Sequence, residues 1–181
     1  KHINMKYLPN ILSSLRIFLA IPILYLLKID FIISAAILFL FSSLTDYFDG
    51  YLARKYLSES DLGAFLDLIA DKILVTSLLI WLVFLLNNQF FTIITILIIL
   101  RELIITSFRY YLVLNNNDHD LIKANIFGKI KTAFQFLSIF LIILSPLFDD
   151  FYFSFVLILL SVSVLFSYFS LMVYFLNWKK K

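Results

Sequence analysis

Four aspartates, Asp46, Asp49, Asp67 and Asp71, stand where one long apolar stretch of the sequence ends and the next begins. Residues three or four positions apart share a helix face, so each of two consecutive helices would present a pair of carboxylates. Carboxylates are costly within a membrane span and need a strong compensating interaction. If the two helices pack side by side, the carboxylate oxygens form a hard-ligand site suited to two Mg²⁺ or Mn²⁺ ions and not to zinc.

Two other interpretations of these aspartates stay open on the residues alone. Arg54 and Lys72 could neutralise them in structural ion pairs, or the carboxylates could face cytoplasmic water. The chain has only three glycines, and Gly50 and Gly63 lie among the aspartates. A residue without a side chain leaves room for a ligand or a neighbouring helix. The glycines therefore favour a site that holds metal and ligand.

The elements that must position these carboxylates are membrane helices. Of the 181 residues, 62% are hydrophobic, whereas soluble domains have roughly 45 to 50%. Six apolar stretches, each near the roughly 20 residues that cross a bilayer, predict an all-α integral membrane protein with six transmembrane helices in a single domain, residues 1–181. Their expected bounds are Ile11–Leu27, Phe31–Phe48, Phe65–Leu86, Phe90–Leu114, Ile130–Leu147 and Phe151–Leu176.

The basic residues predict the orientation of these helices. With the amino terminus inside, only Lys28 falls on the outer side. The cytoplasmic side then receives Lys1, Lys6, Arg54, Lys55, Lys123, Lys129, Lys131 and residues 179–181. Six spans return both termini to the cytoplasm, and the aspartates lie near cytoplasmic helix ends.

Composition also excludes several kinds of site. The chain has no cysteine and two histidines, which excludes disulfides, a thiol nucleophile and imidazole-rich metal sites. Its net charge of +3 is too small to argue for a nucleic-acid partner, because a basic excess in a membrane protein more often reports its topology.

The segment from Asp46 to Asp71 reads DYFDGYLAR, eight further residues, then GAFLDLIAD. It matches every fixed position of D-x2-D-G-x2-A-R-x8-G-x3-D-x3-D, and by this signature the chain resembles the CDP-alcohol phosphotransferase family. The resemblance implies that family's six-helix membrane fold. It also implies transfer of a phosphoalcohol group from a CDP-linked donor to a hydroxyl, with release of CMP.

The same resemblance implies roles for individual residues. The four aspartates would hold two divalent cations, Mg²⁺ or Mn²⁺, and Asp71 would be the general base for a direct attack on the donor. The positions that match donor-binding positions of the family are Asn10, Gly50, Ala53, Arg54, Ser60 and Gly63.

A second set of basic residues lies later in the sequence. Arg101 follows the largely apolar stretch 93–100, and it cannot easily be solvated there unless it faces a polar cavity. This region and the segment around Arg16 resemble the bacterial phosphatidylglycerophosphate synthases of the family, which implies CDP-diacylglycerol as donor and sn-glycerol 3-phosphate as acceptor. The expected ligands of the acceptor phosphate are Arg101, Arg109, Lys129, Lys131 and Arg16.

Alternatives to this assignment stay open. The later basic residues could follow the positive-inside rule alone, with one ion pair between Arg101 and Glu102. Within the family, the acceptor could be serine, inositol phosphate or phosphatidylglycerol, although a neutral acceptor would leave the basic residues without a partner. A divalent-cation transporter would also use intramembrane carboxylates, but near the bilayer midplane on broken helices.

The resemblance carries further expectations about the protein's setting. It implies a homodimer in the inner membrane of a bacterial cell, surrounded by membrane lipid. The active site would face the cytoplasm.

Overall fold

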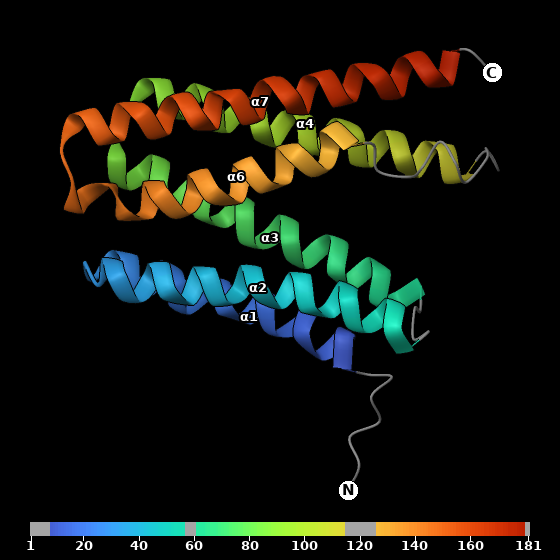
Figure 1. Ribbon diagram of the computed structural model, residues 1–181, viewed down its shortest axis with the longest axis horizontal. Coiled ribbons are helices and arrows are strands. Elements are labelled where there is room, and N and C mark those ends of the chain that lie inside the picture. The colour runs from blue at the N-terminus through green and yellow to red at the C-terminus, as the bar shows by residue number, and fades with distance from the viewer. Residues whose placement is uncertain (1–7, 57–60, 115–125, 180–181) are drawn as a thin grey trace, which may run out of the picture. The chain divides into compact units, whose positions relative to one another are not determined.

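The structure is a computed structural model that describes residues 8–56, 61–114 and 126–179. These residues form six long α-helices and a short 3₁₀ helix, and no β-strand occurs among them (Figure 1). The elements are α1 (Leu8–Lys28), α2 (Ile32–Tyr56), α3 (Asp61–Leu86), α4 (Gln89–Leu114), α6 (Ile126–Leu144), η2 (Ser145–Leu147) and α7 (Asp150–Lys179). The predicted all-α class is confirmed.

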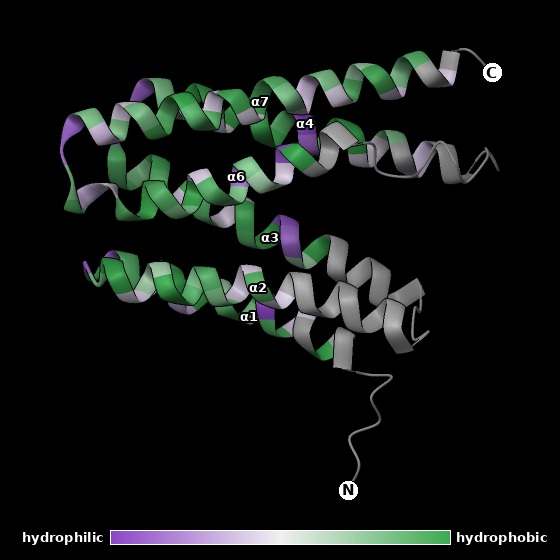
Figure 2. Ribbon diagram, viewed as in Figure 1, coloured by the Kyte–Doolittle hydropathy of each residue, from purple (hydrophilic) through white to green (hydrophobic). Residues whose placement is uncertain are grey.

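Apolar residues predominate in the parts of these helices that Figure 2 colours by hydropathy. Four stretches of the described chain are long and apolar enough to cross a membrane: Ile69–Leu86, Gln89–Phe108, Ile130–Leu147 and Asp150–Leu176. α2 adds a shorter apolar stretch, Ile32–Thr45. Helices suit this setting because they satisfy every backbone polar group internally. The chain is a multi-pass membrane protein, while six spans and their orientation stay predictions.

Two helix boundaries in the signature segment differ from those predicted by hydropathy. α2 runs eight residues beyond the expected end at Phe48, to Tyr56, and α3 begins at Asp61, before the expected Phe65. An apolar stretch marks the part of a helix that lipid can cover, whereas backbone hydrogen bonds can carry the helix on through polar positions. The backbone of the signature segment is therefore helical on both sides of residues 57–60.

α6 ends earlier than hydropathy predicts, at Leu144, and the residues Ser145–Leu147 form the 3₁₀ turn η2. Pro146 explains this end, because proline lacks an N–H and disfavours the α conformation at the residue before it. Asp149 then begins the next helix, since its Oδ1 accepts a hydrogen bond of 3.0 Å from the Tyr152 N–H. That contact is the usual helix N-cap arrangement.

The first of two compact units comprises Lys1–Leu85. In this unit α1 and α2 pack against each other, joined by a three-residue turn in which Asp30 adopts a left-handed conformation with φ 60°. Small side chains are buried on both helices, Ala20 on α1 and Ala35 and Ala36 on α2. Small residues let membrane helices approach closely, so these alanines explain the packing of this pair.

The second unit comprises Leu86–Lys181, and in it α7 packs against both α4 and α6. Two tyrosines of α7 donate hydrogen bonds to backbone carbonyls of these neighbours. The Tyr152 hydroxyl donates to the Leu141 carbonyl of α6 at 3.1 Å, and the Tyr168 hydroxyl donates to the Leu97 carbonyl of α4 at 3.1 Å. α7 thus holds both other helices of its unit. The single domain expected from the sequence stays a prediction.

The packing of α1 on α2 predicts the effect of enlarging a buried alanine. Ala35 has an exposed fraction of 0%, so Ala35→Leu should destabilise the protein by about 1 to 3 kcal/mol through overpacking. Thermal unfolding of the purified protein in detergent measures this. The matched control is Ser34→Leu, which adds the same side chain at the exposed neighbouring position and should leave the unfolding temperature nearly unchanged. Equal effects of the two changes would contradict the packing described.

Candidate functional site

The four signature aspartates lie on two consecutive helices of the amino-terminal unit. Asp46 and Asp49 are in the second half of α2, and Asp67 and Asp71 are in the first half of α3. Asp61 at the start of α3 follows Tyr56 at the end of α2 by five positions, so these helix ends lie no more than about 18 Å apart. Because the backbone is helical through both pairs, each pair shares a helix face.

Asp71 is the one signature aspartate whose side chain belongs to the described part of the chain. It is half-buried on α3, between the fully buried Ala70 and Leu74. The side chains of Asp46, Asp49 and Asp67 lie outside the described part. The convergence of all four carboxylates therefore stays a prediction.

The donor chemistry of this segment fits a hard divalent cation. A half-buried carboxylate on an apolar helix, such as Asp71, requires a compensating positive charge. The signature supplies carboxylate oxygens and no sulfur or imidazole, which is the ligand set that Mg²⁺ and Mn²⁺ prefer. The residues present therefore suit the cations that the signature implies.

The predicted donor-binding residues lie in the same unit as the aspartates. Asn10 is in α1, while Gly50, Ala53 and Arg54 are in α2 and Gly63 is in α3. Gly50 adjoins Asp49, and Gly63 lies one helical turn before Asp67. Ser60 lies outside the described residues. The side chains of Asn10, Ala53 and Arg54 do so too, and the contacts with a donor stay predictions.

Arg101 of α4 is buried, with an exposed fraction of 5%. Its Nε donates a hydrogen bond to the Ser167 carbonyl of α7 at 3.1 Å, and its Nη1 donates to Oε1 of Glu102 at 3.0 Å. The sequence had predicted that Arg101 needs a polar cavity. Instead, a carboxylate and a backbone carbonyl of the protein itself solvate the guanidinium group.

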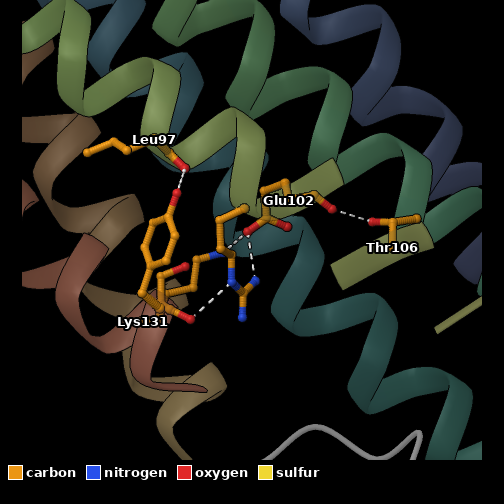
Figure 3. A network of polar contacts seen from close by, with 7 residues as sticks. Leu97, Glu102, Thr106 and Lys131 are labelled. Carbon is orange, nitrogen blue, oxygen red and sulfur yellow. Dashed lines mark hydrogen bonds and ion pairs between the residues drawn. The ribbon is translucent and has the colours of Figure 1, made fainter. Parts of the chain in front are cut away.

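Lys131 of α6 reaches the same carboxylate. It is also 5% exposed, and its Nζ donates to Oε1 of Glu102, the oxygen that Arg101 contacts. Figure 3 shows the side chains of Glu102 and Lys131 meeting across this contact. Groups from three helices are therefore joined through Glu102 and Arg101. We call Arg101, Glu102, Lys131 and the Ser167 carbonyl the buried ion cluster.

The charges of the buried ion cluster do not cancel, because two cations share one carboxylate. Nitrogens bonded to a single oxygen lie within about 6 Å of each other. Two unit charges about 5 Å apart repel by about 3 kcal/mol at an effective permittivity of about 20. Glu102 offsets this repulsion, and the formal charges of the three named side chains sum to one positive charge. The cluster is therefore suited to attract an anion.

Arg101 also keeps hydrogen-bond donors for such an anion. Its two hydrogen bonds use Nε and Nη1, and Nη2 makes none to any described residue. A guanidinium group binds phosphate well because its planar N–H groups match the phosphate oxygens. The buried ion cluster thus has the charge and the donors of a phosphate site.

The structure brings together two of the five predicted ligands of the acceptor phosphate, Arg101 and Lys131. Arg109 lies two turns after Arg101 on α4, and Lys129 lies on α6 before Lys131, but their side chains are outside the described part. Arg16 lies on α1 in the amino-terminal unit, where it is fully buried. Their membership of an acceptor site stays a prediction.

Two features of this cluster were not predicted from the sequence. Glu102 was expected only as a partner of Arg101, although the rarity of charges within membrane helices applies to Glu102 as well. The Ser167 carbonyl could not be predicted, because a backbone group has no signal in the sequence. Gln135, one turn after Lys131 on α6 and 3% exposed, is a further buried polar neighbour in sequence.

Comparison with known proteins extends over most of the chain. Residues 6–174 match the family model described as CDP-alcohol phosphatidyltransferase. No solved structure matches the chain significantly. Several similar proteins carry the name CDP-diacylglycerol--glycerol-3-phosphate 3-phosphatidyltransferase.

Three of these relatives show the range of similarity. The protein of Wigglesworthia glossinidia brevipalpis is 36% identical over 148 residues, which cover 80% of this chain and 79% of the relative. The protein of Bacillus subtilis is 39% identical over 150 residues, 81% of this chain and 75% of the relative. The protein of Mycoplasma pneumoniae is 31% identical over 155 residues, 74% of this chain and 66% of the relative. With a family model matching 169 of its 181 residues, from 6 to 174, this chain belongs to the CDP-alcohol phosphatidyltransferase family.

Proposed function

We propose that this chain transfers the phosphatidyl group of CDP-diacylglycerol to sn-glycerol 3-phosphate, which yields phosphatidylglycerol phosphate and CMP. The buried ion cluster is the observation that carries the proposal, because its net positive charge and the unused Arg101 donors suit a phosphorylated acceptor. Relatives named for this reaction support the same substrates. A neutral acceptor would give the charge of the cluster no partner.

In the proposed reaction, a hydroxyl oxygen of the acceptor attacks the phosphatidyl phosphorus directly. The bond from that phosphorus to the bridging oxygen breaks, and CMP leaves with the electron pair. Asp71 accepts the proton of the hydroxyl group, a role that suits a half-buried carboxylate held on a rigid helix. Asp46, Asp49, Asp67 and Asp71 would hold two divalent cations, Mg²⁺ or Mn²⁺, whose charge stabilises the donor diphosphate when they are bound.

Substrate binding is assigned to two sets of residues. Donor contacts belong to Asn10, Gly50, Ala53, Arg54, Ser60 and Gly63, as the resemblance to the family implies. Arg101 and Lys131 bind the acceptor phosphate, and Arg109, Lys129 and Arg16 are further ligands. Arg101 and Lys131 have the best support, since both contact the same carboxylate.

The proposal also includes the protein's setting. The enzyme is a multi-pass protein of the bacterial inner membrane that acts as a homodimer, with its active site facing the cytoplasm. The distribution of lysine and arginine in the sequence supports this orientation, because positively charged loops stay on the cytoplasmic side.

A direct assay tests the proposed reaction. Purified protein in detergent receives CDP-diacylglycerol, Mg²⁺ or Mn²⁺, and one acceptor at a time: glycerol 3-phosphate, serine, inositol phosphate or phosphatidylglycerol. We expect metal-dependent release of CMP with glycerol 3-phosphate and formation of phosphatidylglycerol phosphate, identified by mass spectrometry. Preference for another acceptor would overturn the substrate assignment, and metal transport without CMP release would favour a transporter.

The assignment of the aspartates predicts two different losses. Asp71→Asn should lower kcat by at least about 100-fold, because general-base catalysis contributes about 10² to 10⁴, while donor binding remains. Asp49→Ala should instead raise the metal concentration needed for half-maximal activity. Initial rates of CMP release over a metal titration measure both. Asp150→Asn, an exposed acid of α7, is the control, and near-normal activity of Asp71→Asn or Asp49→Ala would contradict the metal and base assignment.

The acceptor assignment predicts a selective defect in Lys131→Met. Hydrogen bonds to charged groups contribute about 1.5 to 3 kcal/mol, so the KM for glycerol 3-phosphate should rise by about tenfold or more. The KM for CDP-diacylglycerol should change little. Lys28→Met removes an exposed lysine at the end of α1 and should leave both constants unchanged. Equal increases in both KM values for Lys131→Met would argue against an acceptor site here.

A further inference from the structure

Glu102 is the one acidic side chain in the buried ion cluster. Two cations, Arg101 of α4 and Lys131 of α6, contact the same atom of this carboxylate, Oε1. The side chains of the two partners are 6% and 7% exposed, and that of Glu102 is 15% exposed. This carboxylate therefore determines where two buried positive charges lie relative to each other.

We propose that Glu102 is a positioning residue for the acceptor phosphate. Its carboxylate holds the Arg101 guanidinium and the Lys131 ammonium next to each other, so that a phosphate meets both at once. Glu102 itself stays in place when the phosphate binds. The inference rests on the proposed function, in which Arg101 and Lys131 are the ligands of that phosphate.

The two cations come from different helices, and Glu102 is a contact that they share. Arg101 has a second anchor, because its Nε donates to the Ser167 carbonyl of α7 at 3.1 Å. Lys131 has a long flexible side chain, and such chains extend toward water when their charge is not compensated. Without the negative charge of Glu102, the contact that places the Lys131 ammonium beside the Arg101 guanidinium is lost, and the two positive charges repel each other. The phosphate would then no longer meet both cations at once.

The contact with Glu102 does not use all the N–H groups of Arg101. Glu102 engages Nη1 of Arg101, whereas Nη2 makes no hydrogen bond to any described residue. A phosphate oxygen can use the N–H groups of Nη2 while the ion pair stays intact. The anion therefore adds to the cluster, and it need not compete with the carboxylate.

Binding of inorganic phosphate tests this role without any catalytic step. Isothermal titration of the purified full-length protein in detergent compares wild type with Glu102→Gln, Lys131→Met and the double variant. We expect Glu102→Gln to weaken phosphate binding by about tenfold or more, since a neutral amide leaves the cations uncompensated. In the double variant, binding should match that of Lys131→Met alone, because Glu102 acts through Lys131.

Steady-state kinetics provides a readout that a merely structural role would not produce. Glu102→Gln should raise the KM for glycerol 3-phosphate by about tenfold or more, with kcat within about threefold of wild type. A structural defect would lower kcat and raise both KM values together. Asp150→Asn is the matched control, because it is the same class of acid-to-amide change at an exposed position of the same unit.

Four outcomes would overturn the inference. Tighter phosphate binding by Glu102→Gln would show that the carboxylate competes with the anion. Unchanged binding by Glu102→Gln would remove any role in positioning. Losses that add in the double variant would show that Glu102 does not act through Lys131. A decrease in kcat together with an increase in both KM values would show that the role of Glu102 is structural.

The experiment still tests the role of Glu102 if Glu102→Gln fails to fold or if the proposed function fails. If Glu102→Gln does not fold, the double variant removes one charge of each sign and keeps the buried charge unchanged. Phosphate binding weaker than in Lys131→Met would then contradict the inference, and equal binding would support it. If wild type releases no CMP with glycerol 3-phosphate, the proposed function fails, while the phosphate titrations still decide the role of Glu102.

Discussion

The cost of charge inside an apolar helical bundle determines where this chain can hold ionic groups. Lipid cannot solvate a carboxylate or a guanidinium group, so each must find its partner within the protein or in a ligand. Arg101 shows how this is achieved, because its guanidinium group donates one hydrogen bond to Glu102 and one to the Ser167 carbonyl. The same requirement ties α6 to α4 through Lys131. The ion pair therefore places Lys131 of α6 beside Glu102 of α4. Apolar packing alone does not select one pair of residues in this way.

α7 supplies the fixed framework for the carboxyl-terminal unit. It packs on α4 and on α6, and its Tyr152 and Tyr168 donate hydrogen bonds to a backbone carbonyl of each. Its Ser167 carbonyl holds Arg101 as well. Backbone carbonyls of a membrane helix move little, because the helix's own hydrogen bonds hold them. A binding residue anchored to such a carbonyl keeps its orientation when no ligand is present, which lowers the entropic cost of binding.

The sequence was sufficient for the helical class and for the approximate helix positions, since apolar stretches separated by polar residues mark them clearly. It was not sufficient for the helix ends near Tyr56 and Leu144, where backbone hydrogen bonding and Pro146 decide. In the candidate site, the aspartate spacing could be read directly, because both residues of each pair lie on one helix. The contact of Lys131 with Glu102 could not, since it joins residues 29 positions apart. Such a contact depends on how helices pack, and the spacing of residues along the chain carries no record of it.

A site with two cations and one carboxylate is better suited to phosphate than the simpler alternatives. Two bare cations in an apolar surrounding would repel each other and favour water over the protein interior. A balanced pair would have no net charge and would gain little from an incoming anion. With Glu102 between Arg101 and Lys131, the protein tolerates both cations in the empty state and still retains one unit of positive charge. One carboxylate can thus stabilise the two cations before phosphate binds and still leave the positive charge that attracts the phosphate.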